Sequence, residues 1–222
     1  MKFKDELKKI FGLQKEEAAF PFHENNLNKH CFFKCVEGSS IEIEYLDLIR
    51  GLIFATKPKF VLETGPFKGY STIAIASALK ENGFGKVYSI EISDEFSKEA
   101  KINLEKFNLD NFEIINKSSL SGICSLGFKF SFVLLDSGSN SSHLSTRIDE
   151  LELLIKRNML EDDCFIVIHD TSKFDKRFLE FRKQIEKLCY KHRLQRMSFD
   201  LSRGINLLKF EKQINPFVKI FN

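Results

Sequence analysis

One loop in the first third of the chain carries residues suited to binding a ligand. In the segment FVLETGPFKGYST, an apolar run leads into a loop with Gly65 and Gly69, followed by Ser71 and Thr72. Glycines let a backbone approach a ligand closely, and hydroxyls and N–H groups at a helix start can bind a carboxylate. The dinucleotide pattern GxGxxG is not met, because Pro66 stands where the middle glycine would fall. The loop therefore indicates a small-molecule site or, as the plainer alternative, only a strand-to-helix turn.

A single acidic residue ends the next apolar run. Glu91 is the last residue of KVYSIE. At the end of a second strand in a nucleoside-binding sheet, a carboxylate can accept hydrogen bonds from both ribose hydroxyls. Many strands end in Glu, so this position becomes informative only when it is combined with the loop before it.

A parallel sheet is needed to bring these positions together. Short apolar runs alternate with amphipathic segments, which is the pattern of buried strands and crossover helices. Near the C-terminus, one long amphipathic helix precedes two further strands whose three-residue link is too short for a crossover, so this pair must be antiparallel. The expected strands are residues 60–63, 86–91, 112–115, 130–136, 164–169, 194–201 and 205–210, and the expected helices are residues 71–80, 94–107, 144–156 and 174–189.

The same pattern sets the domain organisation. Residues 1–39 combine a helical start with an irregular, Asn-rich stretch, and we expect them to form an N-terminal extension. Residues 40–222 begin with a helix that Pro58 ends, and we expect them to form one domain with its own core.

Composition excludes several classes of protein. With 222 residues, 43% of them hydrophobic, and 34 Lys and Arg against 31 Asp and Glu, the chain is typical of folded globular proteins and not of disordered ones. Its five cysteines are scattered, as expected for reduced thiols. No apolar run approaches the roughly 18 residues that cross a bilayer, and the first residues lack a signal-peptide pattern, so we expect a cytoplasmic protein without a membrane segment.

Charge is divided unevenly along the chain. Residues 172–222 hold 13 Lys and Arg against 5 Asp and Glu, a balance of +8, whereas residues 1–171 hold 21 against 26, a balance of −5. A solvated helix face explains most of this excess. The alternative is a basic surface for an anionic substrate, such as a nucleotide sugar, a phosphorylated glycan or RNA.

Taken together, these motifs resemble class I S-adenosylmethionine-dependent methyltransferases, and VLETGPFKGYST is similar to their first motif in small-molecule O-methyltransferases of the catechol type. The resemblance implies an α/β fold, a Rossmann-like three-layer sandwich with a seven-stranded, mostly parallel sheet and an antiparallel C-terminal hairpin. It also implies S-adenosylmethionine as the cofactor, with the methionine moiety at the glycine loop, the ribose at Glu91 and the adenine near residues 114–120. The cofactor-binding residues that it implies are Glu63, Gly65, Phe67, Gly69, Ser71, Thr72, Glu91, Ile92, Ser118, Ser119 and Asp136.

The fourth and fifth strands narrow the resemblance to the macrocin O-methyltransferase and cephalosporin-hydroxylase-like group. FVLLDSGSNSSH keeps Asp136, and FIVIHDTS keeps His169 and Asp170, which the resemblance implies as catalytic residues. Asp136 and Asp170 could also hold Mg²⁺, because carboxylate oxygens are the ligands that this ion prefers. Where metal-dependent relatives carry a further Asn or Asp, this chain has Thr171, so the metal is left open.

Methyl transfer from a sulfonium requires alignment of the acceptor oxygen with the methyl carbon and removal of the hydroxyl proton. The candidate bases are His143, His169 and Asp170, unless a bound Mg²⁺ lowers the pKa of the hydroxyl instead. We expect O-methylation of a hydroxylated small molecule or sugar, with residues 1–39 as a lid over the acceptor or as a contact in a homodimer. There are two alternatives. One is methylation of RNA, which the basic C-terminal region suggests, and the other is cofactor binding without transfer. Nucleic acid is the less favoured partner.

Overall fold

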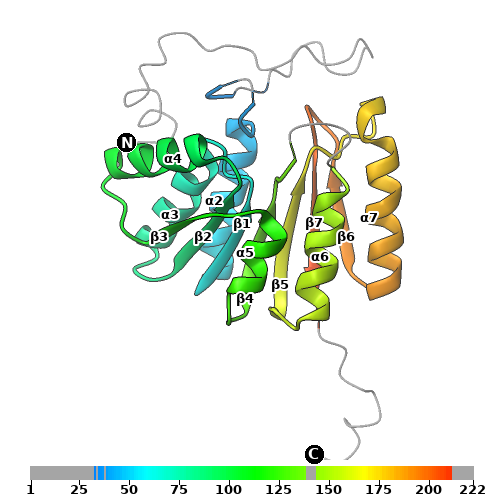
Figure 1. Cartoon of the computed structure of the whole chain (residues 1–222). Helices are drawn as coiled ribbons and strands as arrows, with labels where there is room; N and C mark the ends of the chain where they lie inside the picture. Colours follow the sequence, from blue (N-terminus) through cyan, green and yellow to red (C-terminus); the bar gives the residue numbers. More distant parts are fainter. Residues whose placement is uncertain (1–32, 34, 38, 139–143, 212–222) are drawn as a thin grey trace, which may run out of the picture.

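The computed structural model describes residues 33, 35–37, 39–138 and 144–211 of the chain, and within them seven strands form one sheet (Figure 1). The strand order is β3-β2-β1-β4-β5-β7-β6. All neighbouring strands pair in parallel except β7, which is antiparallel to both β5 and β6. The strands are β1 (Phe60–Thr64), β2 (Lys86–Glu91), β3 (Phe112–Asn116), β4 (Phe130–Leu135), β5 (Leu160–His169), β6 (Gln195–Phe199) and β7 (Ile205–Phe210). The predicted fold class is confirmed.

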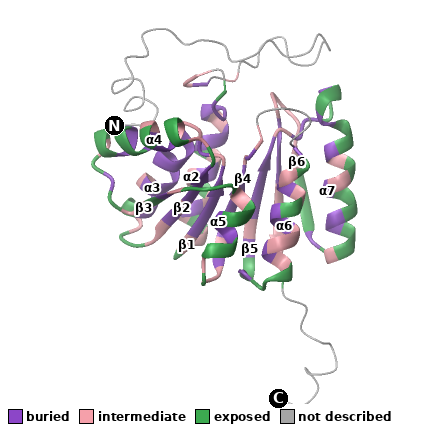
Figure 2. Ribbon diagram, in the orientation of Figure 1, coloured by how far each residue is buried: buried purple, intermediate pink, exposed green. Residues whose placement is uncertain are grey.

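Helices cover both faces of this sheet, because its central strands are apolar on both sides. Side chains alternate along a strand, so Val61 and Phe132 pack under one layer of helices while Leu62 and Val133 pack under the other. Figure 2 shows the strands largely buried and the outer faces of the helices exposed. The first layer is α2 (Ile43–Thr56), α3 (Tyr70–Glu81) and α4 (Asp94–Lys106), and the second is α5 (Ser119–Ser125), α6 (Thr146–Lys156) and α7 (Leu179–His192), which follows the short 3-10 turn Lys176–Phe178.

Three elements differ most from the sequence expectation. Helix α5 was not expected, because only seven residues form it and its buried side is short. Strand β5 begins at Leu160 and not at Cys164, since its buried first residue is followed by three exposed acids, which an apolar criterion omits. Helix α7 begins at Leu179, because Asp175 accepts a hydrogen bond from the N–H of Arg177 and so caps a separate turn.

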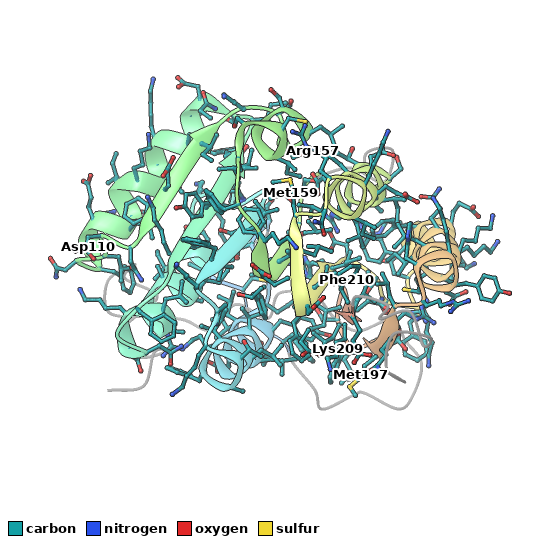
Figure 3. All side chains as sticks on the ribbon, turned by 90° about the horizontal axis from the view of Figure 1, so that it is seen from below. Asp110, Arg157, Met159, Met197, Lys209 and Phe210 are labelled. Atoms are coloured by element: carbon teal, nitrogen blue, oxygen red, sulfur yellow. The ribbon has the colours of Figure 1, made fainter. Side chains whose placement is uncertain are left out.

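The parallel strands bring their carboxyl ends to one edge of the sheet. Register pairs Thr64 with Leu135, and Leu135 with Ile168, so that the residues that follow β1, β4 and β5 are neighbours. Figure 3 looks from below at the opposite edge, where Met159 precedes β5 and Phe210 ends the antiparallel β7. Among the described residues, no helix combines the length and the apolar character that a membrane span requires.

Candidate active site at the carboxyl edge of the sheet

The glycine loop between β1 and α3 is held tightly against β4. Gly65 has φ +72°, and a Cβ at this position would lie 2.7 Å from the carbonyl carbon of Asp136 and closer still to its oxygen. Gly69 has φ +85° and stands at the N-cap of α3. Both glycines are therefore required by backbone geometry, and the loop leaves the N-terminus of α3 at the edge of the sheet.

A buried carboxylate lies beneath this loop. Glu63, at the end of β1, is fully buried, and its Oε2 accepts hydrogen bonds from Thr72 Oγ1 at 2.6 Å and Ser89 Oγ at 2.5 Å. Burial raises the pKa of Glu63, although the neighbouring hydroxyls oppose this. Its Oε1 is buried and accepts no hydrogen bond from any described residue. Thr72 is fully buried as well, so these two predicted cofactor-binding residues support the loop from within, while Ser71 is 6% exposed.

Glu91 is fixed by the backbone on either side of it. Its Oε2 accepts from the N–H of Phe67 at 3.1 Å and its Oε1 from the N–H of Ser93 at 2.9 Å. Burial raises the pKa of Glu91, opposed by these N–H groups. The Phe67 ring, on a residue with φ 53°, packs edge-on against Phe96 with the ring centroids 4.5 Å apart. Two loops thus fix the orientation of the Glu91 carboxylate, and both of its oxygens can still accept further hydrogen bonds.

The residues predicted to frame an adenine lie on neighbouring loops. Ile92 follows Glu91 and is 73% exposed, which is unusual for an isoleucine. Ser118 is exposed at the N-cap of α5, and Ser119 opens that helix beside the buried Glu150. A Cβ at Gly122 would lie 2.6 Å from Ile90, so α5 packs closely on β2 and holds these positions at the edge.

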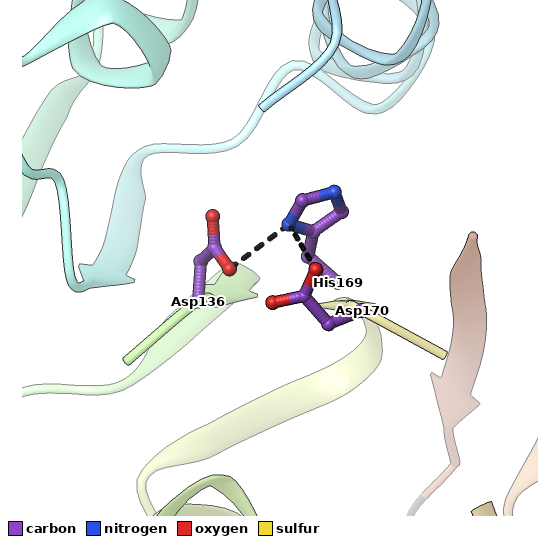
Figure 4. A group of neighbouring side chains, drawn as sticks. All are labelled: Asp136, His169 and Asp170. Carbon is purple, nitrogen blue, oxygen red and sulfur yellow. Dashed lines mark hydrogen bonds and ion pairs between the residues drawn. The ribbon is translucent and has the colours of Figure 1, made fainter. Parts of the chain in front are cut away.

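Asp136, His169 and Asp170 meet where β4 and β5 end (Figure 4). Nδ1 of His169 lies 3.0 Å from Asp136 Oδ1 and 3.6 Å from Asp170 Oδ1. The histidine is fully buried, whereas the side chains of Asp136 and Asp170 are 16% and 14% exposed. The structure therefore brings together the three predicted catalytic residues, with the two carboxylates as the groups that solvent can reach.

Three charged residues that the sequence did not single out complete this cluster. Glu42 is fully buried at the N-cap of α2, and its carboxylate accepts hydrogen bonds from Ser202 Oγ and from the N–H of Arg203. Arg203, in the link between β6 and β7, also lies 3.8 Å from Asp170. Arg147, from the first turn of α6, is 1% exposed and lies between the carboxylates of Asp136 and Asp170. We call these six residues the charge network: Glu42, Asp136, Arg147, His169, Asp170 and Arg203.

The contacts of the two ring nitrogens of His169 indicate its protonation state. Nε2 lies 2.8 Å from Glu42 Oε2, while Nδ1 faces Asp136. A neutral imidazole has only one donor, and two carboxylates can both be satisfied only by the imidazolium form. Burial alone would lower the pKa of His169, but Asp136, Asp170 and Glu42 raise it to about 9. Burial likewise would raise the pKa of Glu42, but His169 and Arg203 hold it well below its usual range.

The Mg²⁺ expected at Asp136 and Asp170 can be tested against these contacts. The ligand atoms of Asp136, His169 and Asp170 lie within 4.8 Å of one another, as a metal site would need. However, Nη2 of Arg147 lies 3.1 Å from Asp136 Oδ1 and 3.0 Å from Asp170 Oδ2, and both nitrogens of His169 face carboxylates. The residues present do not fit a divalent cation, because the group between the two acids is a guanidinium.

The described part of the N-terminal extension reaches the glycine loop. Glu37 pairs with Lys68 at 2.9 Å and accepts a hydrogen bond from the hydroxyl of Tyr70 at 3.1 Å. Residues 1–32 and His143, one of the predicted bases, lie outside the described residues. Whether the extension covers an acceptor stays a prediction.

The basic C-terminal region forms several ion pairs. Arg182 lies 2.6 Å and Lys173 3.2 Å from Asp200, and Arg177 pairs with Asp175 at 2.5 Å. These two acids are already counted in the +8 balance, so the excess itself is reduced only by acids from outside the region: Glu152 pairs with Lys191, Asp163 with Lys209, and Glu42 and Asp170 with Arg203.

Residues 62–171 match a family described as a methyltransferase domain. These residues span β1 to the end of β5, and thus carry the glycine loop, Glu91 and both carboxylates. Strand order and the antiparallel β7 agree with this match, so residues 62–171 form a methyltransferase domain with the class I fold.

Solved structures with the same fold include several bound to the cofactor or its product. A methyltransferase of Podospora anserina, PaMTH1, bound to S-adenosylhomocysteine (SAH), is 13% identical over 78% of this chain and 81% of its own, with a TM-score of 0.67. An O-methyltransferase of Bacillus cereus in complex with SAH is 20% identical over 79% and 84%, with a TM-score of 0.65. The O-methyltransferase TomG of Streptomyces achromogenes, in complex with S-adenosylmethionine, is 18% identical over 79% and 83%, with a TM-score of 0.66. No curated protein matches the sequence. The narrower resemblance to the macrocin and cephalosporin-hydroxylase-like group stays a prediction.

Proposed function

We propose that this protein transfers a methyl group from S-adenosylmethionine to a hydroxyl of a small molecule or sugar. The observation that carries the proposal is the position of Glu91, fixed by two backbone N–H groups next to the glycine loop and followed by an exposed Ile92. A carboxylate held in this way can accept both hydroxyls of a ribose, and an exposed isoleucine offers an apolar surface to an adenine. The structures that share the fold include O-methyltransferases, which supports oxygen as the acceptor atom.

The glycine loop would receive the methionine end of the cofactor. The N-terminus of α3 can bind a carboxylate through its free N–H groups. The buried Glu63 Oε1, which accepts no hydrogen bond from the described residues, fits a donor such as the cofactor ammonium. Gly65 lets this loop approach the backbone of Asp136 closely, because a side chain there would collide with it.

The reaction requires little covalent chemistry from the protein. The acceptor oxygen attacks the methyl carbon, the carbon–sulfur bond breaks, and its electron pair stays on sulfur to give SAH. Alignment supplies most of the rate, and the hydroxyl proton must leave to a carboxylate or to solvent. Asp136 is suited to accept it, because its Oδ1 is bound within the charge network while its Oδ2 has no polar contact among the described residues.

His169 serves this reaction as a positioning residue. With both ring nitrogens against carboxylates it has no free nitrogen with which to act as a base. It can instead fix the direction of the Asp136 carboxylate. Asp170, with a pKa that burial would raise but that His169 and Arg147 lower, stays ionised beside it.

Binding of SAH, measured by isothermal titration calorimetry, tests the cofactor site. We expect saturable binding by the wild type and at least a tenfold weaker affinity for Glu91→Ala, since two charge-assisted hydrogen bonds would be lost. Glu113→Ala is the matched control, because Glu113 lies exposed on the neighbouring strand and pairs with Lys86. Absence of SAH binding at millimolar concentration would refute the proposal.

Turnover with radiolabelled S-adenosylmethionine and a set of hydroxylated metabolites and sugars tests the transfer. We expect Asp136→Asn to bind SAH within a few-fold of wild type while losing most of the turnover on any acceptor found. If Asp136→Asn turns over at the wild-type rate, Asp136 does not handle the acceptor proton.

A further inference from the structure

The strongest observation beyond this function is a buried guanidinium at the place where the fold's two acids converge. Arg147 is among the most deeply buried large side chains of the described residues, with 1% exposure. Its Nη2 lies 3.1 Å from Asp136 Oδ1 and 3.0 Å from Asp170 Oδ2. It therefore sits between the ends of β4 and β5, where a cation shared by both carboxylates would have to lie.

Hydrogen bonds to the backbone keep this side chain in place. Nε donates to the carbonyl of Ser137 at 2.6 Å, Nη1 to that of His169 at 2.5 Å, and Nη2 to that of Gly138 at 3.3 Å. The guanidinium also stacks over the ring of Phe181, with Cζ 5.7 Å from the ring centroid. Moving Arg147 aside for a metal would leave three carbonyls in a buried region without their donor, which is unfavourable.

The charges of the network also argue against a metal at this place. Each of the three carboxylates, from Glu42, Asp136 and Asp170, already lies within ion-pair distance of the guanidinium of Arg147 or Arg203. Three carboxylates and two guanidiniums sum to −1, so a divalent cation would leave this buried cluster with a net positive charge, at a desolvation cost. The carboxylates therefore need no metal as a counterion.

The side chains of Arg147 and His169 can also fix the two carboxylates in the way that a shared ion would. A divalent cation between two strand ends would fix the carboxylates relative to each other through its coordination geometry. Arg147 does so with a planar set of donors that contacts both carboxylates and the two backbones that carry them. His169 fixes Asp136 from the other side.

We propose that Arg147 takes the place of a divalent cation at the carboxyl ends of β4 and β5, so that this protein positions Asp136 and Asp170 without a metal. Arg147 is then a positioning residue, and it tunes the acceptor side of the site whose transfer reaction is proposed above. The metal-binding prediction for Asp136 and Asp170 would accordingly not hold for this chain.

Manganese binding tests this directly, because Mn²⁺ occupies the same oxygen sites as Mg²⁺ and its free form gives an electron paramagnetic resonance signal. With the full chain at sub-millimolar Mn²⁺, we expect the free-ion signal to be unchanged. Arg147→Ala should take up one equivalent, because it frees both carboxylates, and adding Asp170→Asn to it should abolish that uptake. Arg147→Lys should take up none, since an ammonium keeps a cation between the acids.

Arg50→Ala is the matched control, because Arg50 is also largely buried and pairs with Glu81 away from this edge; it should gain no Mn²⁺ binding. One equivalent bound by the wild type and lost in Asp170→Asn would overturn the proposal, and so would a folded Arg147→Ala that binds none. Should Arg147→Ala fail to fold, the wild type and Asp170→Asn still decide the question. Failure of SAH binding refutes only the proposed function, since the Mn²⁺ measurement needs no cofactor.

Discussion

The two halves of the carboxyl edge are built in different ways. At β1 and β2, Glu63 and Glu91 are held by hydroxyls and backbone N–H groups that lie 2 to 26 residues away in the sequence. At β4, β5 and β7, the charge network joins groups as far apart as Glu42 and Arg203, 161 residues from each other. The first half is neutral apart from its carboxylates, whereas the second consists of opposite charges buried against one another.

This difference predicts how each half responds to change. A carboxylate fixed by neutral donors loses one or two hydrogen bonds when a donor is removed, each worth about 1 kcal/mol. A buried charge that loses its partner is left uncompensated, which costs several times more. The charge network should therefore dominate stability, and the glycine-loop half should dominate cofactor binding.

The largest effect is expected from Glu42→Gln. Loss of this fully buried charge leaves His169 and Arg203 without their shared carboxylate, and we expect the free energy of unfolding to fall by about 3 to 5 kcal/mol. Chemical denaturation followed by circular dichroism measures this. Asp47→Asn, an exposed acid on the same helix α2, should change stability by less than about 0.5 kcal/mol. Equal effects of the two substitutions would contradict a special role for the network.

The next effect is a dependence of stability on pH. His169 has a pKa of about 9 in the folded protein against an ordinary 6.5, so its protonation stabilises the fold fully below pH 6.5. This stabilisation, about 3 kcal/mol, should disappear as the pH rises towards 9, since one pKa unit corresponds to about 1.4 kcal/mol. Denaturation at several pH values across this window measures the slope, and His169→Gln should flatten it. A wild-type stability that is constant or rises over the same window would contradict the imidazolium form.

Gly65→Ala should be less damaging to the fold than Glu42→Gln but more damaging to the ligand site. A Cβ there would meet the Asp136 backbone at positive φ, and we expect a loss of about 2 to 3 kcal/mol together with at least a tenfold loss of SAH affinity. Gly83→Ala separates strain from collision, because Gly83 has a similar φ of +82° and nothing within 4 Å of its Cβ position. The control should lose only about 1 kcal/mol and keep its SAH affinity. Similar losses in both variants would show that the close approach of Asp136 does not matter.

The smallest effect on the fold is expected from Ile92→Ser. This side chain is 73% exposed, so its removal should leave the unfolding free energy within about 0.5 kcal/mol of wild type. If it supports an adenine, SAH affinity should still fall roughly threefold to tenfold, because apolar contact with the ring is lost. Ile102→Ser, at a 53% exposed position on α4, should change neither quantity. An unchanged SAH affinity for Ile92→Ser would remove this residue from the site.

The fold could be predicted from the sequence to a large extent. Alternating apolar runs and amphipathic segments marked all seven strands, and the short link of Ser202, Arg203 and Gly204 required an antiparallel pair, as the structure has it. Where the prediction differed, local signals were weak. Helix α5 is short, and three exposed acids follow the buried Leu160 at the start of β5.

The residues of the glycine-loop half of the site could also be predicted from the sequence. Gly65, Gly69 and Glu91 lie in short segments whose spacing predicts a ligand site, because a strand, its loop and the next strand end are close in both sequence and space. Asp136, His169 and Asp170 were predicted from the resemblance to the methyltransferase group, and their position at the ends of two apolar strands placed them together, because parallel strands end at one edge.

The sequence by itself thus determined the sheet, the glycine loop and the acids at the strand ends, since these depend on periodicity and local spacing. Only the tertiary structure decided what surrounds the acids. Glu42 stands in the sequence as an ordinary residue at the start of a helix, Arg147 as a charge in the first turn of another, and Arg203 as part of a turn. Their burial and pairing arise from packing between segments far apart in the chain, and a buried charge is defined by its partners and not by its own neighbours in sequence.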